Sequence, residues 1–307
     1  MAGAMSSAAY RRVIRRGAAR AIGVAAAVAA GLGMAGAAAT CGGSDDFLLA
    51  TTTSVNDSGL LDALVPVFEQ ESGINVKVIA VGTGAALRMA ELGNADALFV
   101  HAPSAEQVLV EQGDVVDRRL VAYNDFLIAG PPDDPAGLAG MDDVAAALTR
   151  LAQAGAAGRA RFLSRGDDSG THKREQALWA EAGLQPLGEW YLESGQGMGA
   201  SLQVASQRRA YVLTDRATFL ALRSDLDLAP LVERDPLLIN LYSVMRVNPD
   251  KGDIHADAAI AWLRFITRDD VQARIAAFRA EEFGRPLFIP AAGNSEAEVT
   301  AEFAAAR

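Results

Sequence analysis

Three short polar segments combine hydroxyl groups, glycines and one arginine, and this combination suits the binding of an anion. The segments are Thr51-Thr52-Thr53-Ser54, Gly82-Thr83-Gly84 and Ser164-Arg165-Gly166-Asp167-Asp168-Ser169-Gly170-Thr171. Hydroxyl and main-chain N–H groups donate hydrogen bonds to oxyanions, and glycine lets the main chain approach a ligand closely. The planar guanidinium of Arg165 can donate to two oxygens of one ligand at once. Together the segments supply the donors and the positive charge that a tetrahedral dianion requires.

None of the three segments is specific when it is taken alone. Threonine and serine commonly cap helices, and Gly-Thr-Gly is an ordinary turn sequence. Arg165 lies beside Asp167 and Asp168, so a surface ion pair is an alternative, as is a role for Asp167 in positioning the arginine. The evidence lies in the joint placement of the segments. Several charge-assisted hydrogen bonds of about 1.5–3 kcal/mol each could together reach nanomolar affinity, or roughly 12 kcal/mol.

Each polar segment follows an apolar run that is typical of a strand and precedes a helical pattern. The runs are Phe47–Ala50, Asn75–Val81 and Arg161–Leu163, and the helical patterns are Leu60–Phe68 with Asp57 or Ser58 as N-cap, Ala85–Leu92 and His172–Ala182. Ala97–Val100 is a further buried strand. This alternation predicts a parallel sheet with helices on its faces. In such sheets ligands bind at the carboxyl ends of strands, beside helix N-termini.

The same alternation continues toward the C-terminus. Expected strands are Phe126–Ala129, Ala210–Leu213 and Leu237–Val247, and expected helices are Asp142–Ala154, Ala256–Phe265 and Val271–Phe278. Three other features stay open. His101 either lines a ligand-binding cleft or simply ends a strand. The Gly195–Gly199 loop either offers main-chain donors or acts as a hinge or turn, and Asp215 and Arg216 are candidates for an ion pair behind the site.

The N-terminus has the pattern of an export signal over residues 1–40. Five arginines precede the uncharged stretch Ala21–Ala39, which is too rich in alanine and glycine for a permanent membrane span. Ala37 and Ala39 match an A-x-A cleavage site. Cys41 follows directly and resembles a lipoprotein acceptor, although Ala38 replaces the usual leucine. A soluble exported protein and a lipid-anchored one are therefore both expected alternatives, and the protein is expected in the periplasm or at the outer face of the cell membrane.

Charge and motif content exclude several classes of function. The net charge is −10, and residues 41–307 hold 23 basic and 38 acidic groups, about −15, because the five arginines of residues 1–40 are set aside. This acidic surface does not favour nucleic acid or anionic lipid. The three histidines are scattered, which argues against a metal site. No G-x-S-x-G, H-E-x-x-H or P-loop motif is present, so an enzyme is not expected.

Six stretches in order resemble the tungstate-binding proteins of ABC transporters. They are TTTSVNDSGLLDALVPVFEQESGINVKVIAVGTGAAL, NADALFVHAP, YNDFLIAGPPDDPAG, FLSRGDDSGTHKREQALW, ESGQGMGASL and AYVLTDRATFL, and they span about Leu48 to Val247. The resemblance implies an α/β, two-lobed periplasmic-binding-protein fold of type II with the ligand cleft between the lobes. We place lobe one at residues 44–122 plus 241–307 and lobe two at residues 123–240. The ligand is expected to be tungstate or molybdate, with no cofactor, and the expected partner is a membrane permease that a monomer would dock on.

The resemblance also carries the family's binding residues onto this chain. The candidate ligand-binding residues are Thr52, Thr53, Ser54, Thr83, Gly84, Arg165, Ser169, Gly170 and Thr171. Phosphate-binding relatives share the Arg-x-Asp-x-Ser-Gly-Thr spacing but use a carboxylate near the third strand of the first lobe. This sequence has Val100-His101-Ala102 there, which favours an unprotonated ion. A phosphate or sulfate binder is the alternative within the fold, and an exported enzyme acting on phosphoryl or sulfuryl compounds is the alternative outside it.

Overall fold

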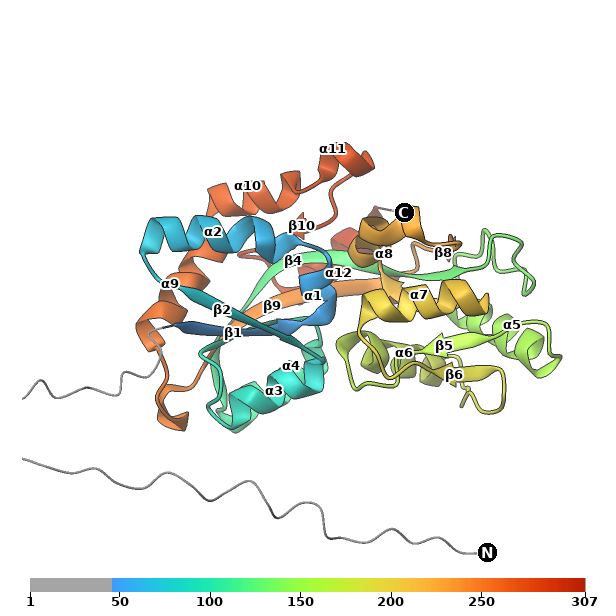
Figure 1. Cartoon of the computed structure of the whole chain (residues 1–307), viewed down its shortest axis with the longest axis horizontal. Helices are drawn as coiled ribbons and strands as arrows, with labels where there is room; N and C mark the ends of the chain where they lie inside the picture. The colour runs from blue at the N-terminus through green and yellow to red at the C-terminus, as the bar shows by residue number, and fades with distance from the viewer. Residues whose placement is uncertain (1–45, 307) are drawn as a thin grey trace, which may run out of the picture. The chain divides into compact units, whose positions relative to one another are not determined.

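The computed structural model describes residues 46–306, which fold as mixed α/β structure (Figure 1). The predicted export signal at residues 1–40 and Cys41 lie outside the described residues. The strands are β1 (Phe47–Thr52), β2 (Val76–Val81), β3 (Ala97–Val100), β4 (Val115–Gly130), β5 (Phe162–Ser164), β6 (Tyr191–Glu193), β7 (Val212–Asp215), β8 (Ala229–Val232), β9 (Ile239–Val247) and β10 (Ile289–Pro290). Within the described part of the chain, no helix is both long enough and apolar enough to cross a membrane.

The helices include most of those that the sequence predicts. They are α1 (Thr53–Asp57), α2 (Leu60–Ser72), α3 (Thr83–Glu91), α4 (Pro103–Gln112), α5 (Val144–Ala156), α6 (Gly170–Glu181), α7 (Met198–Arg208), α8 (Arg216–Leu222), α9 (Ala256–Ile266), α10 (Asp269–Ala277), α11 (Ala280–Phe283) and α12 (Glu296–Ala305), with short 3-10 turns at Arg223–Asp225, Pro236–Leu238 and Pro249–Lys251. Sequence patterns had not identified α1, α4, α7, α8, α11 or α12.

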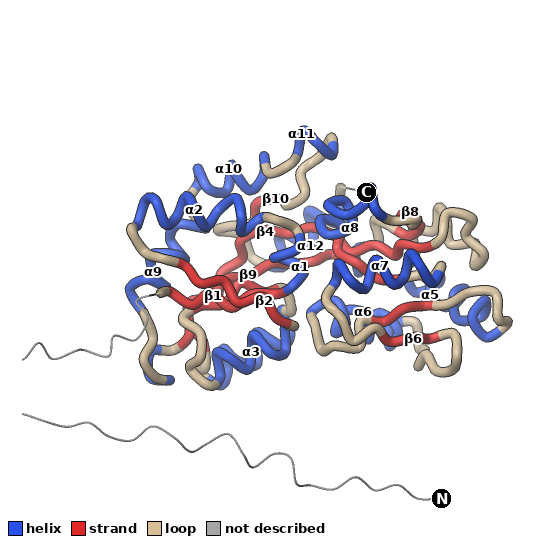
Figure 2. The backbone as a smooth tube through the Cα atoms, viewed as in Figure 1, coloured by secondary structure: helices blue, strands red, loops and turns tan. Residues whose placement is uncertain are grey.

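The largest sheet has the strand order β10-β4-β9-β3-β1-β2. The predicted parallel arrangement is confirmed for β1 with β2 and for β1 with β3, whereas β9 runs antiparallel to both β3 and β4. Alternating residues of β1 face different layers: Leu49 packs with α2 and α9, and Ala50 packs with α3 and α4. Figure 2 shows helices on both faces of this sheet. This packing fixes the carboxyl ends of β1 and β2 side by side.

A second group of strands continues from the end of β4. Its residues Phe126–Ala129 pair with β7, and the adjoining residues Ile128–Gly130 pair with β8. Strands β5 and β6 form a separate parallel pair, and β5 is linked to β7 by a parallel bridge between Phe162 and Tyr211. A distinct apolar cluster, which contains Phe162, Trp179 and Tyr211, packs around these strands. The carboxyl ends of β5 and β7 therefore point the same way.

Helix starts differ from the predictions at the places that matter for the site. The prediction of Asp57 or Ser58 as the N-cap of the first long helix is wrong, because a separate short helix, α1, occupies Thr53–Asp57. Ser58 ends α1, and Gly59, with a φ of 79°, is the N-cap of α2. Helices α3 and α6 each begin two residues earlier than predicted. Thr53, Ser54, Thr83, Gly84, Gly170 and Thr171 consequently lie in first helical turns, whose main-chain N–H groups have no partner within the helix itself.

Candidate functional site

The first polar segment joins β1 to α1. Thr51 Oγ1 donates to the main-chain oxygen of Phe99 at 2.7 Å, and Thr52 Oγ1 accepts from Val55 N at 3.2 Å as the N-cap of α1. The structure therefore uses both hydroxyls locally, while Thr53 lies partly exposed and Ser54 is buried in the first turn of α1.

The second segment lies against the third, although more than 80 residues separate them in the sequence. Thr83 Oγ1 accepts a hydrogen bond from Gly170 N at 2.6 Å, and Gly84 N donates to the main-chain oxygen of Asp168 at 3.2 Å. A Cβ at Gly84 would overlap the carboxylate of Asp168. The main chain at Gly84 thus lies close to a neighbour, as the sequence suggested, but this neighbour is the end of the exposed Asp168 side chain.

Arg165 is the central charged group of the site. Its side chain is 1% exposed; Nε donates to Gln196 O at 2.8 Å, and Nη2 pairs with the carboxylate of Asp167 and lies 3.4 Å from Thr53 Oγ1. Asp167 thus contacts the guanidinium directly. Within residues 46–306, Nη1 is buried and has no hydrogen-bond partner. The guanidinium is therefore held in place on two of its nitrogens and keeps its third free to donate.

The remaining candidates form the first turn of α6. Ser169 Oγ caps the helix by accepting from His172 N at 3.2 Å, and Thr171 is fully buried with no partner for Oγ1 in the described chain. A Cβ at Gly170 would lie 3.0 Å from both Cε1 and the main-chain oxygen of His101. Gly170 is therefore needed for the contact between α6 and the end of β3.

The starts of four helices are joined in two pairs at the candidate site. The contact between Thr83 and Gly170 joins α3 to α6, and Arg165 itself joins Thr53 of α1 to Gln196, just before α7. Gly197 caps α7, and Gly199 N donates to Asp57 Oδ2 at 3.2 Å. Each helix N-terminus carries a partial positive charge. The Gly195–Gly199 loop thus belongs to the site, and its glycine spacing before α7 was the signal available in the sequence.

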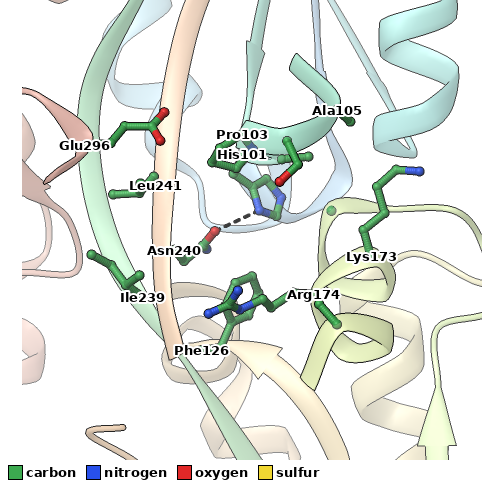
Figure 3. Close-up of a pocket in the computed structure, with 14 residues that line it drawn as sticks. His101, Pro103, Ala105, Phe126, Lys173, Arg174, Ile239, Asn240, Leu241 and Glu296 are labelled. Carbon is green, nitrogen blue, oxygen red and sulfur yellow. Dashed lines mark hydrogen bonds between the residues drawn. The ribbon is translucent and has the colours of Figure 1, made fainter. Parts of the chain in front are cut away.

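His101 lines a cavity of about 380 Å³ beside this cluster (Figure 3). Asn240 Nδ2 donates to Asn124 Oδ1 and to the Tyr242 hydroxyl, so its Oδ1 faces His101 Nδ1 at 3.0 Å. This arrangement places the ring hydrogen on Nδ1 and leaves Nε2 as an acceptor. Burial lowers the pKa of His101 to about 4, so the ring is neutral at pH 7. His101 therefore adds no positive charge to the site.

The predicted ion pair between Asp215 and Arg216 is wrong. Arg216 pairs with Asp125 and Glu233, because its guanidinium points back toward β4 and β8. Asp215 instead caps α8 by accepting from Thr218 N at 2.8 Å. His255, for which the sequence shows no partner, lies 3.2 Å from Asp96 through Nδ1. Across residues 46–306, no three or more histidine, cysteine or acidic side chains are placed to hold a metal ion.

Comparison with known proteins defines first the class and then the family. Residues 25–270 match the PBP superfamily domain. The tungstate-binding protein TupA of Peptoclostridium acidaminophilum is 45% identical over 250 residues, which cover 80% of this chain and 86% of that protein. The chain therefore belongs to the PBP superfamily and, within it, to the family of TupA tungstate-binding proteins.

Two solved structures support the same assignment. The tungstate ABC transporter structure from Geobacter sulfurreducens is 44% identical with a TM-score of 0.70, and it covers 76% of this chain and 99% of its own. The tungstate-binding protein TupA from Desulfovibrio alaskensis G20 is 41% identical with a TM-score of 0.66, and it covers 80% of this chain and 98% of its own. The predicted α/β periplasmic-binding-protein fold of type II is thereby confirmed.

Proposed function

We propose that this protein is an exported solute-binding protein that captures tungstate, or molybdate, for uptake by an ABC transporter. Its family supports this, and one observation in the site carries it: Arg165 Nη1 and Thr171 Oγ1 are buried donors that meet no partner in residues 46–306. Buried donors without a partner are costly. A tetrahedral dianion offers acceptors to both and brings no proton of its own. Because the relatives are binding proteins, this chain is not an enzyme.

In this proposal Arg165 and Thr171 contact the anion directly. The other candidates surround the anion at the starts of three helices. These residues are Ser169 and Gly170 at α6, Thr52, Thr53 and Ser54 at α1, and Thr83 and Gly84 at α3. The present partners of Thr83 and Gly84 are the main chain of Gly170 and Asp168. Residues that approach the ligand therefore also hydrogen-bond to one another across the two segments. Binding of the ligand is thus coupled to the contact between these segments.

We further propose that residues 44–122 with 241–307 move as one lobe and residues 123–240 as the other. The bonds from Gly170 to Thr83 and from Gly84 to Asp168 connect residues on opposite sides of this division. The division falls within β4 and within β9, which pair with each other and provide a two-stranded connection for a hinge. Donors on both lobes reach one ion only when the lobes are together, so the ligand stabilises the closed form.

The location and partners follow from the same function. We propose that residues 1–40 direct export, that the mature protein works as a monomer, and that it docks on a membrane permease. Cys41 would carry a lipid if the protein is anchored. Mass spectrometry of the protein processed in its own host would give the mature N-terminus and would show whether Cys41 is acylated.

Thermal unfolding with tungstate, molybdate, sulfate and phosphate tests the proposal. A ligand at about 1,000 times its dissociation constant stabilises the folded state by roughly 4 kcal/mol. We expect large shifts of the unfolding midpoint with tungstate and molybdate only. A shift with phosphate or sulfate instead would keep the fold and replace the ligand, and the absence of any shift would refute oxyanion binding.

A further inference from the structure

Asp215 has one carboxyl oxygen that the fold does not use. The residue is fully buried at the end of β7, and its Oδ1 accepts from Thr218 N at 2.8 Å as the N-cap of α8. In the described chain Oδ2 is buried and has no hydrogen-bond partner. A buried carboxyl oxygen left without a donor is costly. The helix cap accounts for Oδ1 but leaves Oδ2 unexplained.

The strand topology places Asp215 next to Arg165. Strands β5 and β7 run parallel, with a bridge from Phe162 to Tyr211 and a hydrogen bond of 2.7 Å from Leu163 N to Tyr211 O. Arg165 directly follows β5 and Asp215 is the last residue of β7, three and four residues after the bridge, so both lie at the carboxyl ends of neighbouring strands. The free Oδ2 of Asp215 and the free Nη1 of Arg165 are thus two unused polar groups in one region.

The charges around Asp215 come from several elements. Arg165 attracts the carboxylate and Asp57 of α1 repels it, while the Tyr242 hydroxyl of β9 interacts with it. The guanidinium of Arg216 is committed to Asp125 and Glu233. Burial is the largest influence and raises the pKa of Asp215 to about 6. A dianion bound at Arg165 is a further negative charge and would raise this pKa more.

We propose that Asp215 binds the oxyanion as a neutral carboxylic acid whose Oδ2–H donates to a ligand oxygen, so that binding takes up one proton from solvent. This inference rests on the proposed function and identifies an additional specificity-determining residue. A fully deprotonated anion such as tungstate can accept this hydrogen bond on any oxygen. Hydrogen phosphate brings its own proton and would bind the charged carboxylate with no proton uptake.

Because binding takes up a proton, the affinity for tungstate is expected to fall as the pH rises. Above about pH 6 the free protein must gain a proton on binding, so the dissociation constant rises about tenfold per pH unit until the pKa of the complex is reached. Titration calorimetry with tungstate, in buffers of different ionisation enthalpy, measures the uptake directly. With a pKa of about 6, we expect about 0.9 proton per anion at pH 7.

Asp215→Asn is the decisive variant. Asparagine is as good an N-cap as aspartate, so its oxygen keeps the bond to Thr218 N while its amide nitrogen donates from the position of Oδ2. We expect no proton uptake and, at pH 8, up to about 100-fold tighter tungstate binding, because roughly 1% of wild-type Asp215 is protonated there. Asp143→Asn is the matched control: Asp143 caps α5 through Ala146 N at 2.9 Å but is exposed.

The outcomes separate this inference from the proposed function. Tungstate binding by the wild-type protein with no proton uptake, or uptake that persists in Asp215→Asn, would overturn the role of Asp215 and leave the proposed function intact. No tungstate binding at any pH would overturn both. If Asp215→Asn fails to fold, tungstate binding by the wild-type protein without proton uptake still overturns the inference, and uptake that sets in above a free-protein pKa of about 6 supports it.

Discussion

Replacing Arg165 by lysine separates the charge of this side chain from its geometry. Lysine keeps the positive charge, but one ammonium group cannot replace the bond to Gln196 O, the pair with Asp167 and the free Nη1 at the same time. The direct contact with the ligand is one charge-assisted hydrogen bond, about 1.5–3 kcal/mol. We therefore expect tungstate to bind about 10- to 150-fold more weakly to Arg165→Lys.

Arg165→Ala should have a larger effect. It removes the charge as well and leaves the carboxylate of Asp167 beside the anion without its partner. Truncating one partner of a buried charge pair costs about 3–5 kcal/mol, which corresponds to roughly 150- to 5,000-fold in affinity. We therefore expect the affinity for tungstate to decrease from the wild-type protein to Arg165→Lys and further to Arg165→Ala.

Titration calorimetry at pH 7 measures the three affinities, and unfolding without ligand shows whether each variant is folded. Arg161→Ala is the matched control, because Arg161 is exposed and lies directly before β5, four residues before Arg165. It should bind tungstate as the wild-type protein does. Equal affinity of the wild-type protein and Arg165→Ala would refute the assignment of Arg165 as the principal anion contact.

Three further predictions concern groups around Arg165. Thr83→Val removes the acceptor of Gly170 N and should weaken binding by about 2- to 13-fold in calorimetry, since one neutral hydrogen bond is worth about 0.5–1.5 kcal/mol. Gly170→Ala places a Cβ 3.0 Å from the main-chain oxygen of His101; overpacking of about 1–3 kcal/mol should weaken binding by roughly 5- to 150-fold. Burial raises the pKa of Glu175 from 4.5 to about 7. The free energy of unfolding of the wild-type protein should therefore fall by roughly 3 kcal/mol, relative to that of Glu175→Gln, as the pH rises from 4.5 to 7. Denaturant titrations of both proteins measure this difference.

For each of these three predictions, a particular result would contradict the reasoning. A loss for Thr83→Val as large as that for Arg165→Ala would show that the hydroxyl is a main ligand contact. Unchanged affinity of Gly170→Ala would show that α6 does not need to approach β3 when the anion binds. For Glu175 the sign is fixed by the raised pKa: the folded protein holds the proton more tightly than the unfolded chain, so stability falls as pH rises. A constant difference between the two proteins across this range would contradict a raised pKa.

Much of the fold was predictable because its signals are local. Apolar runs such as Phe47–Ala50 and Ala97–Val100 became strands β1 and β3, and glycines marked where helices end. The helix starts were less predictable. Ser169 caps α6 and is a local signal for a start at Gly170, whereas Gly82 gives α3 no side-chain cap, and the bond from Gly170 N to Thr83 Oγ1 joins the two starts.

The sequence by itself predicted the chemistry of the candidate site: the hydroxyls, the glycines and Arg165 indicate a ligand that accepts hydrogen bonds. It also determined the family, through six long motifs in order. Only the tertiary structure decided which donors stay free: the Thr51 hydroxyl donates to the main-chain oxygen of Phe99, 48 residues away, whereas Arg165 Nη1 and Thr171 Oγ1 meet no partner within residues 46–306. It likewise placed Asp215 near Arg165, since the bridge from Phe162 to Tyr211 joins residues 49 apart in the chain, and such pairing depends on packing that no local pattern records.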